Sequence, residues 1–215
     1  DENISGWDVS NVTVMSHMFQ GASAFNQPIG NWNTSSVTNM QSVFKNATSF
    51  DQDLSDWNFS AVTSTGWGLF SNTPLSNAHK GLIHSSFSSN SIWPFPSWSA
   101  FVPAPASLTN ANFQTAVNLW CSDKAAAFAT YGHIKDWNVT GVTDMSNAFK
   151  DKTTFDANIT GWDVSNVTDM SFMLSGASAF NQPIGDWNVS SVMNMRAMFS
   201  GSTSFNQPIG NWNTN

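Results

Sequence analysis

A tryptophan that returns every 25 residues constrains this chain more than any other feature of its sequence. It occurs in two groups, which comprise Trp7, Trp32 and Trp57 and then Trp137, Trp162, Trp187 and Trp212. A period between about 20 and 50 residues is typical of stacked supersecondary units, none of which can bury its apolar face alone. The sequence therefore predicts a stack of repeats in place of an ordinary globular core.

Each repeat carries the same apolar positions relative to its tryptophan. Val9 and Val164 stand two residues after it, and this alternation predicts a short strand with tryptophan and valine pointing inward. The spacing of Met15, Met18 and Phe19 is i, i+3, i+4, which predicts one or two helical turns. The expected fold is an α/β solenoid, a leucine-rich-repeat-like stack of 25-residue coils that each combine a short parallel strand with a short helix.

The repeat register breaks once, between Trp57 and Trp137, which are 80 residues apart. Four segments are predicted from this break: the end of a first array (residues 1–78), a Ser-, Pro- and aromatic-rich extended connector (79–107), a helical N-terminal cap (108–132) and a second array (133–215). Thr109 or Asn110 is expected to be the N-cap residue of the first helix in residues 108–132, and Gly132 is expected to end the second helix. The chain opens and closes within a repeat, as expected of a piece of a longer repeat protein.

Composition restricts the function classes. Only 10% of the residues are charged and the net charge is −7, which argues against binding to nucleic acid or to an anionic membrane surface. No apolar run approaches the roughly 18–20 residues of a membrane span, so we expect no membrane insertion in this segment. Ser, Thr and Asn dominate the polar residues, which favours an extracellular or cell-surface location.

Two groups of side chains are candidates for a partner surface. The first is an outward polar column formed by the residue after each tryptophan, namely Asp8, Asn33, Asn58, Asn138, Asp163 and Asn188. Its oxygens could bind calcium or saccharide, although hydrogen bonding within each coil would also explain them. The second group lies in the connector, outside the repeat register, and consists of Trp93, Phe95 and Trp98. The repeat tryptophans themselves are expected to be core residues.

Glycosylation sequons recur at repeat positions. Glycans on adjacent coils would lie only about 4.8 Å apart, so most of these sequons are expected to be structural coincidences. Asn46, on the turn after the predicted helix, is more isolated and is the expected site of N-glycosylation.

No residue pattern predicts an enzyme. The four histidines are scattered without metal-ligand spacing. Cys121 and His133 could form a nucleophile pair, but a cysteine on an amphipathic helix is more simply explained by packing. We therefore expect no catalysis, no cofactor and no metal.

The motifs WDVSNVTDMS (162–171) and GASAFNQPIG (176–185), with their 25-residue period, resemble the BspA-like leucine-rich-repeat family of bacteria, mycoplasmas, protists and microalgae. The resemblance covers about residues 1–76 and 133–215, and the segment ending YGHIKDW is similar to a module that precedes such arrays in algal members. It implies a secreted or surface-exposed repeat protein and supplies no catalytic residues.

The expected function is that of a non-catalytic extracellular structural or adhesive protein, an assembly or interaction scaffold within a longer chain. Its expected partners are other copies or further repeats of the same chain. The alternative is a carbohydrate-binding module that contacts surface polysaccharide through the outward polar column or the connector aromatics.

Overall fold

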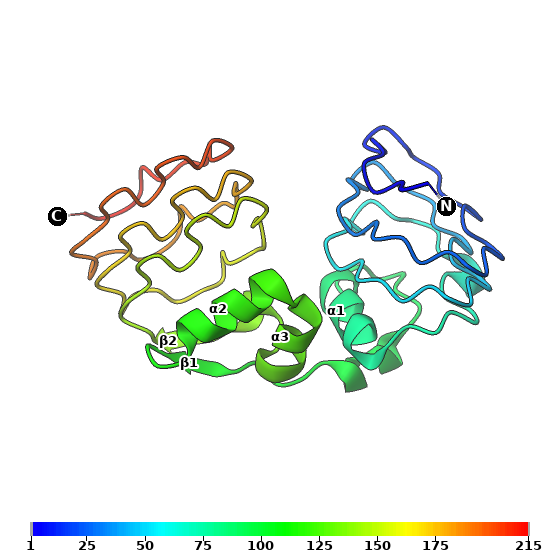
Figure 1. The fold of residues 1–215 in the computed structure, drawn as a ribbon, viewed down its shortest axis with the longest axis horizontal. Coiled ribbons are helices and arrows are strands. Elements are labelled where there is room, and N and C mark those ends of the chain that lie inside the picture. The colour runs from blue at the N-terminus through cyan, green and yellow to red at the C-terminus, as the bar shows by residue number, and fades with distance from the viewer. Residues whose placement is uncertain (1, 215) are drawn as a thin grey trace. The chain divides into compact units, whose positions relative to one another are not determined.

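The computed structural model describes residues 2–214, which belong to two compact units, Asp1–Val102 and Pro103–Asn215. The named elements are, in order, η1 (Gly66–Gly68), α1 (Asn77–Phe87), η2 (Pro96–Phe101), β1 (Ser107–Thr109), α2 (Phe113–Ser122), α3 (Lys124–Tyr131), η3 (Ile134–Asp136) and β2 (Asn138–Gly141). In both units the repeats consist mainly of turns and extended segments, which Figure 1 draws as tubes. No helix among residues 2–214 combines the length and apolar character needed to cross a bilayer.

Successive repeats are joined by hydrogen bonds between residues one period apart. In the first unit Thr38 N–H donates to Thr13 C=O, and Thr63 N–H to Thr38 C=O, each at 2.8 Å. In the second unit Thr168 N–H donates to Thr143 C=O at 2.8 Å. Parallel bridges follow the same register, through Val14, Asn39 and Ser64 in the first unit and through Asp144, Asp169 and Asn194 in the second. One period therefore makes one layer, and each layer lies against the next in fixed register.

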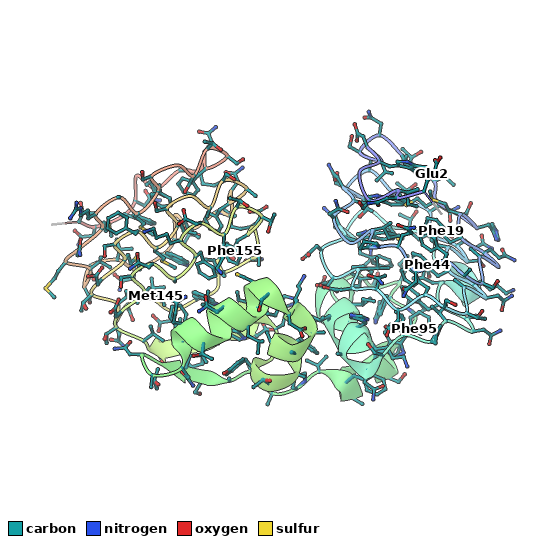
Figure 2. The ribbon with its side chains drawn as sticks, viewed as in Figure 1. Glu2, Phe19, Phe44, Phe95, Met145 and Phe155 are labelled. Carbon is teal, nitrogen blue, oxygen red and sulfur yellow. The ribbon has the colours of Figure 1, made fainter. Side chains whose placement is uncertain are left out.

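The repeat tryptophans of the inner layers fill the core, as predicted, whereas Trp7 in the first layer is exposed and Trp212 in the last layer is half-buried. Trp32 and Trp57 are 2% and 4% exposed, and their rings stack with centroids 6.2 Å apart. The indole N–H of Trp57 donates to Ile29 C=O in the preceding layer at 2.8 Å, so the polar group of a buried ring is satisfied. Phenylalanines form a second ladder, in which Phe19 and Phe44 stack with centroids 5.5 Å apart (Figure 2).

The predicted strand and helix of each repeat do not form as expected. A strand at Trp-x-Val forms once among the described residues, as β2, while elsewhere a turn follows, such as the one closed by Val12 N–H on Val9 C=O at 2.9 Å. The expected helical turns are interrupted because His17 has a φ of 62°. The same left-handed conformation recurs ten residues after the tryptophan in other repeats, at Ser42, Asn147, Phe172 and Ala197.

This interruption turns the backbone toward the next layer. The N–H groups that a helix would use internally donate across the gap between layers, from Met15, His17, Phe19 and Gly21 to the carbonyls of Asn39, Gln41, Val43 and Lys45. The i, i+3, i+4 spacing therefore reflects a turn that buries Met15 and Phe19, with its hydrogen bonds made between repeats.

The prediction of an extended connector over residues 79–107 is wrong for most of its length. α1 begins after Ser76, whose hydroxyl accepts a hydrogen bond from His79 N–H at 3.3 Å. The apolar residues on its inner face are almost fully buried, namely Leu82, Ile83 and Phe87. Burial of this face outweighs the low helix propensity of the surrounding Ser, Asn and Gly. α1 and η2 pack together, and the segment covers the last layer of the first unit.

The helical pair expected within residues 108–132 corresponds to α2 and α3, and Gly132, with a φ of 77°, follows α3. The expected helix cap is wrong, because Thr109 lies in β1 and the N-cap of α2 is Asn112. β1 pairs in parallel with β2, so the cap adds one short strand ahead of the first layer of the second unit.

Candidate functional site

The outward polar column predicted from the sequence is exposed throughout, at Asp8, Asn33, Asn58, Asn138, Asp163 and Asn188. In every case Oδ1 accepts a hydrogen bond from the N–H two residues further on, at distances from 2.9 to 3.2 Å. At Asp8 the same oxygen accepts a second bond from the Ser10 hydroxyl at 2.6 Å. This local ring fixes the turn after the tryptophan, so one oxygen of each column residue is used within its own layer.

The two carboxylates of the column are stabilised in their charged form. Hydrogen bonds from the hydroxyl and N–H of Ser10 lower the pKa of Asp8, and those from Ser165 lower the pKa of Asp163. The other column residues are neutral amides with exposed side chains. The column therefore offers amide and hydroxyl groups with few charges, which suits hydrogen bonding to the hydroxyl groups of a saccharide.

A metal ion fits the column less well than a saccharide. Hard cations such as calcium need six to eight oxygen ligands, and each layer supplies a single column residue whose Oδ1 is already used. Among residues 2–214 no three His, Cys, Asp or Glu side chains come together as a group that could hold a metal.

The connector aromatics divide into a buried and a half-buried set. Trp93 is 8% exposed, and its indole N–H donates to His84 Nδ1 at 3.0 Å and to Phe95 C=O at 3.1 Å. Its ring meets Phe59 of the last layer edge-on, with centroids 5.7 Å apart. The prediction that Trp93 belongs to a partner surface is therefore wrong, because α1 and η2 fold this ring into the core.

Phe95 and Trp98 remain half-buried. Their rings stack with centroids 4.5 Å apart, and both also approach Phe70. Phe95 lies at the end of the first unit covered by α1 and lines a pocket of about 620 Å³ (Figure 2). Of the predicted aromatic surface, this half-buried pair remains accessible.

Asn46, the expected glycosylation site, has a structural role that its sequon did not reveal. It is half-buried, has a φ of 61°, and its Oδ1 accepts a hydrogen bond from Asn72 Nδ2 at 2.7 Å. Its N–H donates to Ser71 C=O in the next layer at 2.8 Å. The residue thus provides the left-handed turn and a contact between two layers.

A second polar ladder, not anticipated from the sequence, runs through the FNQP turns. Asn26 Oδ1 accepts a hydrogen bond from Asp51 N–H at 2.9 Å, and Asn181 Oδ1 accepts one from Asn206 N–H at 2.9 Å. Gln207 Nε2 also donates to Asn181 C=O at 2.9 Å. The recurring Asn-Gln pair before the turn proline is the signal that could have revealed this ladder. Because these polar groups form hydrogen bonds between adjacent layers, the ladder stabilises the stack of repeats.

In the first unit this ladder ends in a side-chain hydrogen bond with α1. Asp51 Oδ1 lies 2.6 Å from His79 Nδ1 and accepts a hydrogen bond from Ser76 N–H at 2.9 Å. Burial raises the pKa of Asp51, but the hydrogen bonds from Ser76 and His79 and the attraction of His79 lower it by more, so the pKa lies below its ordinary value.

We expect the protein to lose stability in acid. The pKa values of Asp51, Asp163 and Asp169 are lowered in the folded state, so their stabilisation is present above their ordinary pKa near 3.8 and is lost as the pH falls through the lower folded values. The midpoint of urea unfolding should therefore fall between pH 5 and pH 3. Asp51→Asn keeps an acceptor for Ser76 N–H but cannot titrate, so it should reduce this fall. An unchanged midpoint at pH 3 would contradict the assignment.

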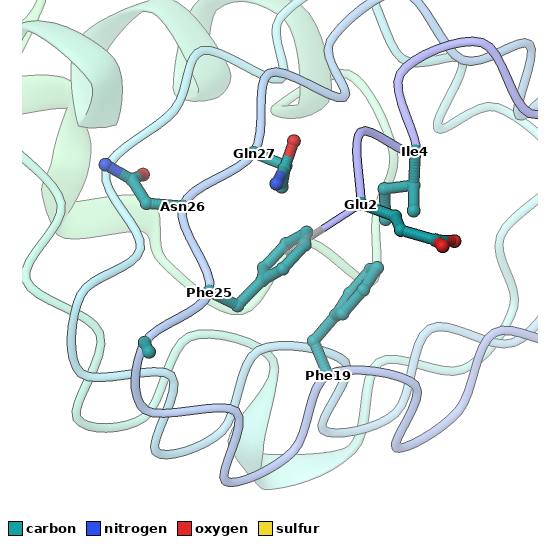
Figure 3. A pocket seen from close by; sticks show the side chains of 7 residues that line it. Glu2, Ile4, Phe19, Phe25, Asn26 and Gln27 are labelled. Atoms are coloured by element: carbon teal, nitrogen blue, oxygen red, sulfur yellow. The ribbon is translucent and has the colours of Figure 1, made fainter.

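A small pocket of about 440 Å³ lies beside the first layer (Figure 3). Its apolar wall consists of Phe19 and Phe25, whose rings stack with centroids 4.0 Å apart, together with Ile4. Glu2, Asn26 and Gln27 supply its polar lining (Figure 3).

The nucleophile pair considered from the sequence gains no support from its surroundings. Cys121 is exposed, and partial desolvation raises the pKa of its thiol despite the opposing charge of Lys152. His133 is 9% exposed, packs edge-on against Trp120 at 5.2 Å, and accepts a hydrogen bond from Lys135 N–H at 3.3 Å. His133 has a packing role in the cap of the second unit, and Cys121 lies on its surface.

Comparison with known proteins places the chain in a family. No curated protein and no solved structure matches it. A family model described as "Mycoplasma protein of unknown function, DUF285" matches residues 1–80 and 111–215, which include the repeats of both units. Because these residues make up well over half of the sequence, the chain belongs to the DUF285 family.

Proposed function

We propose that this protein is a non-catalytic structural or adhesive repeat protein of the cell surface or extracellular space, which serves as an interaction scaffold within a longer chain. The stacked layers would constitute a leucine-rich-repeat-like solenoid of the BspA-like type. Its partners would be other copies or further repeats of the same chain. The match to a family described from mycoplasmas supports this proposal, because the BspA-like repeats that the sequence resembles also occur there.

The observation that carries the proposal is the repetition of one exposed polar residue in every layer. Layers are fixed in register by backbone hydrogen bonds, so the column residues recur at a constant spacing. Each is held in one geometry by the N–H two residues on. A rigid row of similar weak contacts suits multivalent attachment, in which several weak contacts add up to a strong one.

Display of the chain on beads would test the scaffold role. Beads that carry the chain at high density should cluster or attach to a polysaccharide-coated surface, whereas beads with a few copies each should not, because attachment depends on valency. The scaffold proposal would be abandoned if dense beads neither clustered nor attached and the free chain stayed monomeric at all concentrations.

The second candidate, carbohydrate binding, is favoured by the exposed neutral amides of the column. Asn33→Asp and Asn58→Asp would keep the oxygen that accepts from Ser35 and Ser60 but remove the Nδ2 donor. Aspartate already occupies this register at Asp8, so folding should be preserved. If the column binds sugar, the double variant should lose signal on a glycan array that the parent chain gives. No signal from the parent chain would exclude this candidate.

A further inference from the structure

The ladder of parallel bridges in the first unit has an open edge. Its three rungs, one in each layer, are Val14, Asn39 and Ser64. Between the second and third rungs, Thr63 N–H donates to Thr38 C=O at 2.8 Å and Met40 N–H donates to Ser64 C=O at 2.8 Å. The same pair of groups is present on the outer side of the third rung, as Thr63 C=O and Thr65 N–H. Among residues 2–214 neither of these two groups has a hydrogen-bond partner.

Thr65 adds a third polar group at this edge. Thr65 is 6% exposed, and its side chain makes no capping hydrogen bond to η1. The other repeats place methionine in this register, as at Met15 and Met40, so threonine here is both shorter and more polar than the stack requires.

A pocket of about 620 Å³ opens directly onto the unpaired edge. It is lined by residues 63–66 on one side and by Ile92, Pro94 and Phe95 on the other. The floor therefore offers backbone and hydroxyl groups, and the wall offers apolar side chains from the segment ahead of η2. This combination fits an extended peptide with one apolar side chain.

At two other places the chain covers backbone groups next to its layers with its own side chains. At the first layer of the second unit, Asn110 Oδ1 accepts hydrogen bonds from Thr143 N–H at 2.9 Å and from Asp144 N–H at 3.2 Å. In the first unit, Asn90 Nδ2 donates to Phe59 C=O and to Val62 C=O, each at 2.9 Å. The carbonyl of Thr63, one residue beyond Val62, has no such cover. The covering formed by α1 and η2 therefore leaves the edge at Thr63 unpaired.

We propose that this edge binds an extended peptide segment of a partner protein as a fourth parallel rung. The register of the third rung defines the pairing: one peptide N–H donates to Thr63 C=O, and the carbonyl of the next peptide residue accepts from Thr65 N–H. The residue after that projects its side chain into the pocket above Thr65. Because methionine fills this register in the repeats, the site selects methionine or a similar unbranched apolar residue. This inference specifies a partner site for the scaffold and so rests on the proposed function.

The repeat sequence itself supplies the probe. The peptide VTNMQSV, identical to residues 37–43, places its methionine in the pocket when it pairs in the register described above. Titrated against the full chain with a fluorescent label, it should bind saturably, and the Thr65 amide should show one of the largest NMR shift changes. The peptide VTNDQSV should bind at least tenfold more weakly, because a carboxylate would enter an apolar pocket.

Thr65→Met tests the site from the protein side. It restores the residue that the repeats use in this register and fills the pocket floor, so it should preserve the fold and weaken VTNMQSV binding at least tenfold. Thr203→Met, at an exposed threonine of the second unit, is the matched control and should leave binding unchanged. Equal binding to both variants, or no saturable binding of VTNMQSV, would overturn the inference. Bead clustering by the Thr65→Met chain would show that the scaffold role survives independently of this site.

Discussion

Replacing Trp162 by alanine is expected to destabilise the second unit by about 3–5 kcal/mol, the range for truncation of a large buried aromatic side chain. Trp162 is 3% exposed, and its ring stacks on Trp137 with centroids 6.1 Å apart. Its indole N–H donates to Ile134 C=O at 2.8 Å, so truncation also leaves a buried carbonyl without its partner. A loss of this size is a large part of the whole stability of a small unit.

Hydrogen exchange of the full chain would measure this effect, because it reports on each unit separately. Peptides from residues 137–212 should exchange faster in Trp162→Ala, while peptides from residues 2–87 should not change. Trp7→Ala is the matched control: Trp7 has the same place in its repeat but is 55% exposed, so it should cost far less. Similar losses in the two variants would contradict a core role for the tryptophan ladder.

The inward phase of the repeat could be predicted because burial of a large ring leaves a strong periodic signal. Trp57 and Val62, for example, are 4% and 2% exposed. The exposed phase of Asn58 followed from the same alternation. At these positions the size or polarity of the side chain indicates whether it is buried or exposed.

The backbone of the turn could not be predicted, because the residues at the left-handed position share no chemistry. His17 and Asn147 occupy it with φ of 62° and 58°, and so does Phe172, with a φ of 55°. A bulky residue is rare in this conformation. Phe172 is compensated by two cations from adjacent layers, with Lys150 Nζ 5.5 Å and Arg196 Cζ 5.6 Å from its ring. Such compensation depends on residues 22 and 24 positions away, which no local pattern reveals.

The burial of Trp93 was missed for a related reason. Its neighbours Ser91, Pro94 and Pro96 are typical of an exposed connector. The ring is nevertheless enclosed by His84 on α1 and Phe59 of the last layer. Local composition indicates how a segment behaves in isolation. The last layer of a repeat stack exposes apolar side chains, so an apolar segment that follows it packs over that layer and becomes buried.

Gly176→Ala is the second substitution with a large expected effect, a loss of about 2–4 kcal/mol from the second unit. Gly176 has a φ of 75°, a conformation that costs an alanine about 1–2 kcal/mol. An added Cβ would also lie 2.5 Å from Asp151 Oδ1 and 3.3 Å from Asp151 Cα in the preceding layer. The carboxylate can rotate away, but the Cα can move only if the two layers separate.

Gly21→Ala isolates the conformational part of this cost. Gly21 has a φ of 74° in the same register, but a Cβ there would meet nothing within 4 Å, so the variant should lose only the strain of about 1–2 kcal/mol. Asparagine tolerates the left-handed region better than alanine and occupies this register at Asn46, so Gly21→Asn should lose less still. Urea unfolding of the variants, with hydrogen exchange to assign the affected unit, provides the comparison. An equal loss in Gly176→Ala and Gly21→Ala would mean that the layers can separate to admit a methyl group, and the fixed spacing on which the outward polar column depends would then be in doubt.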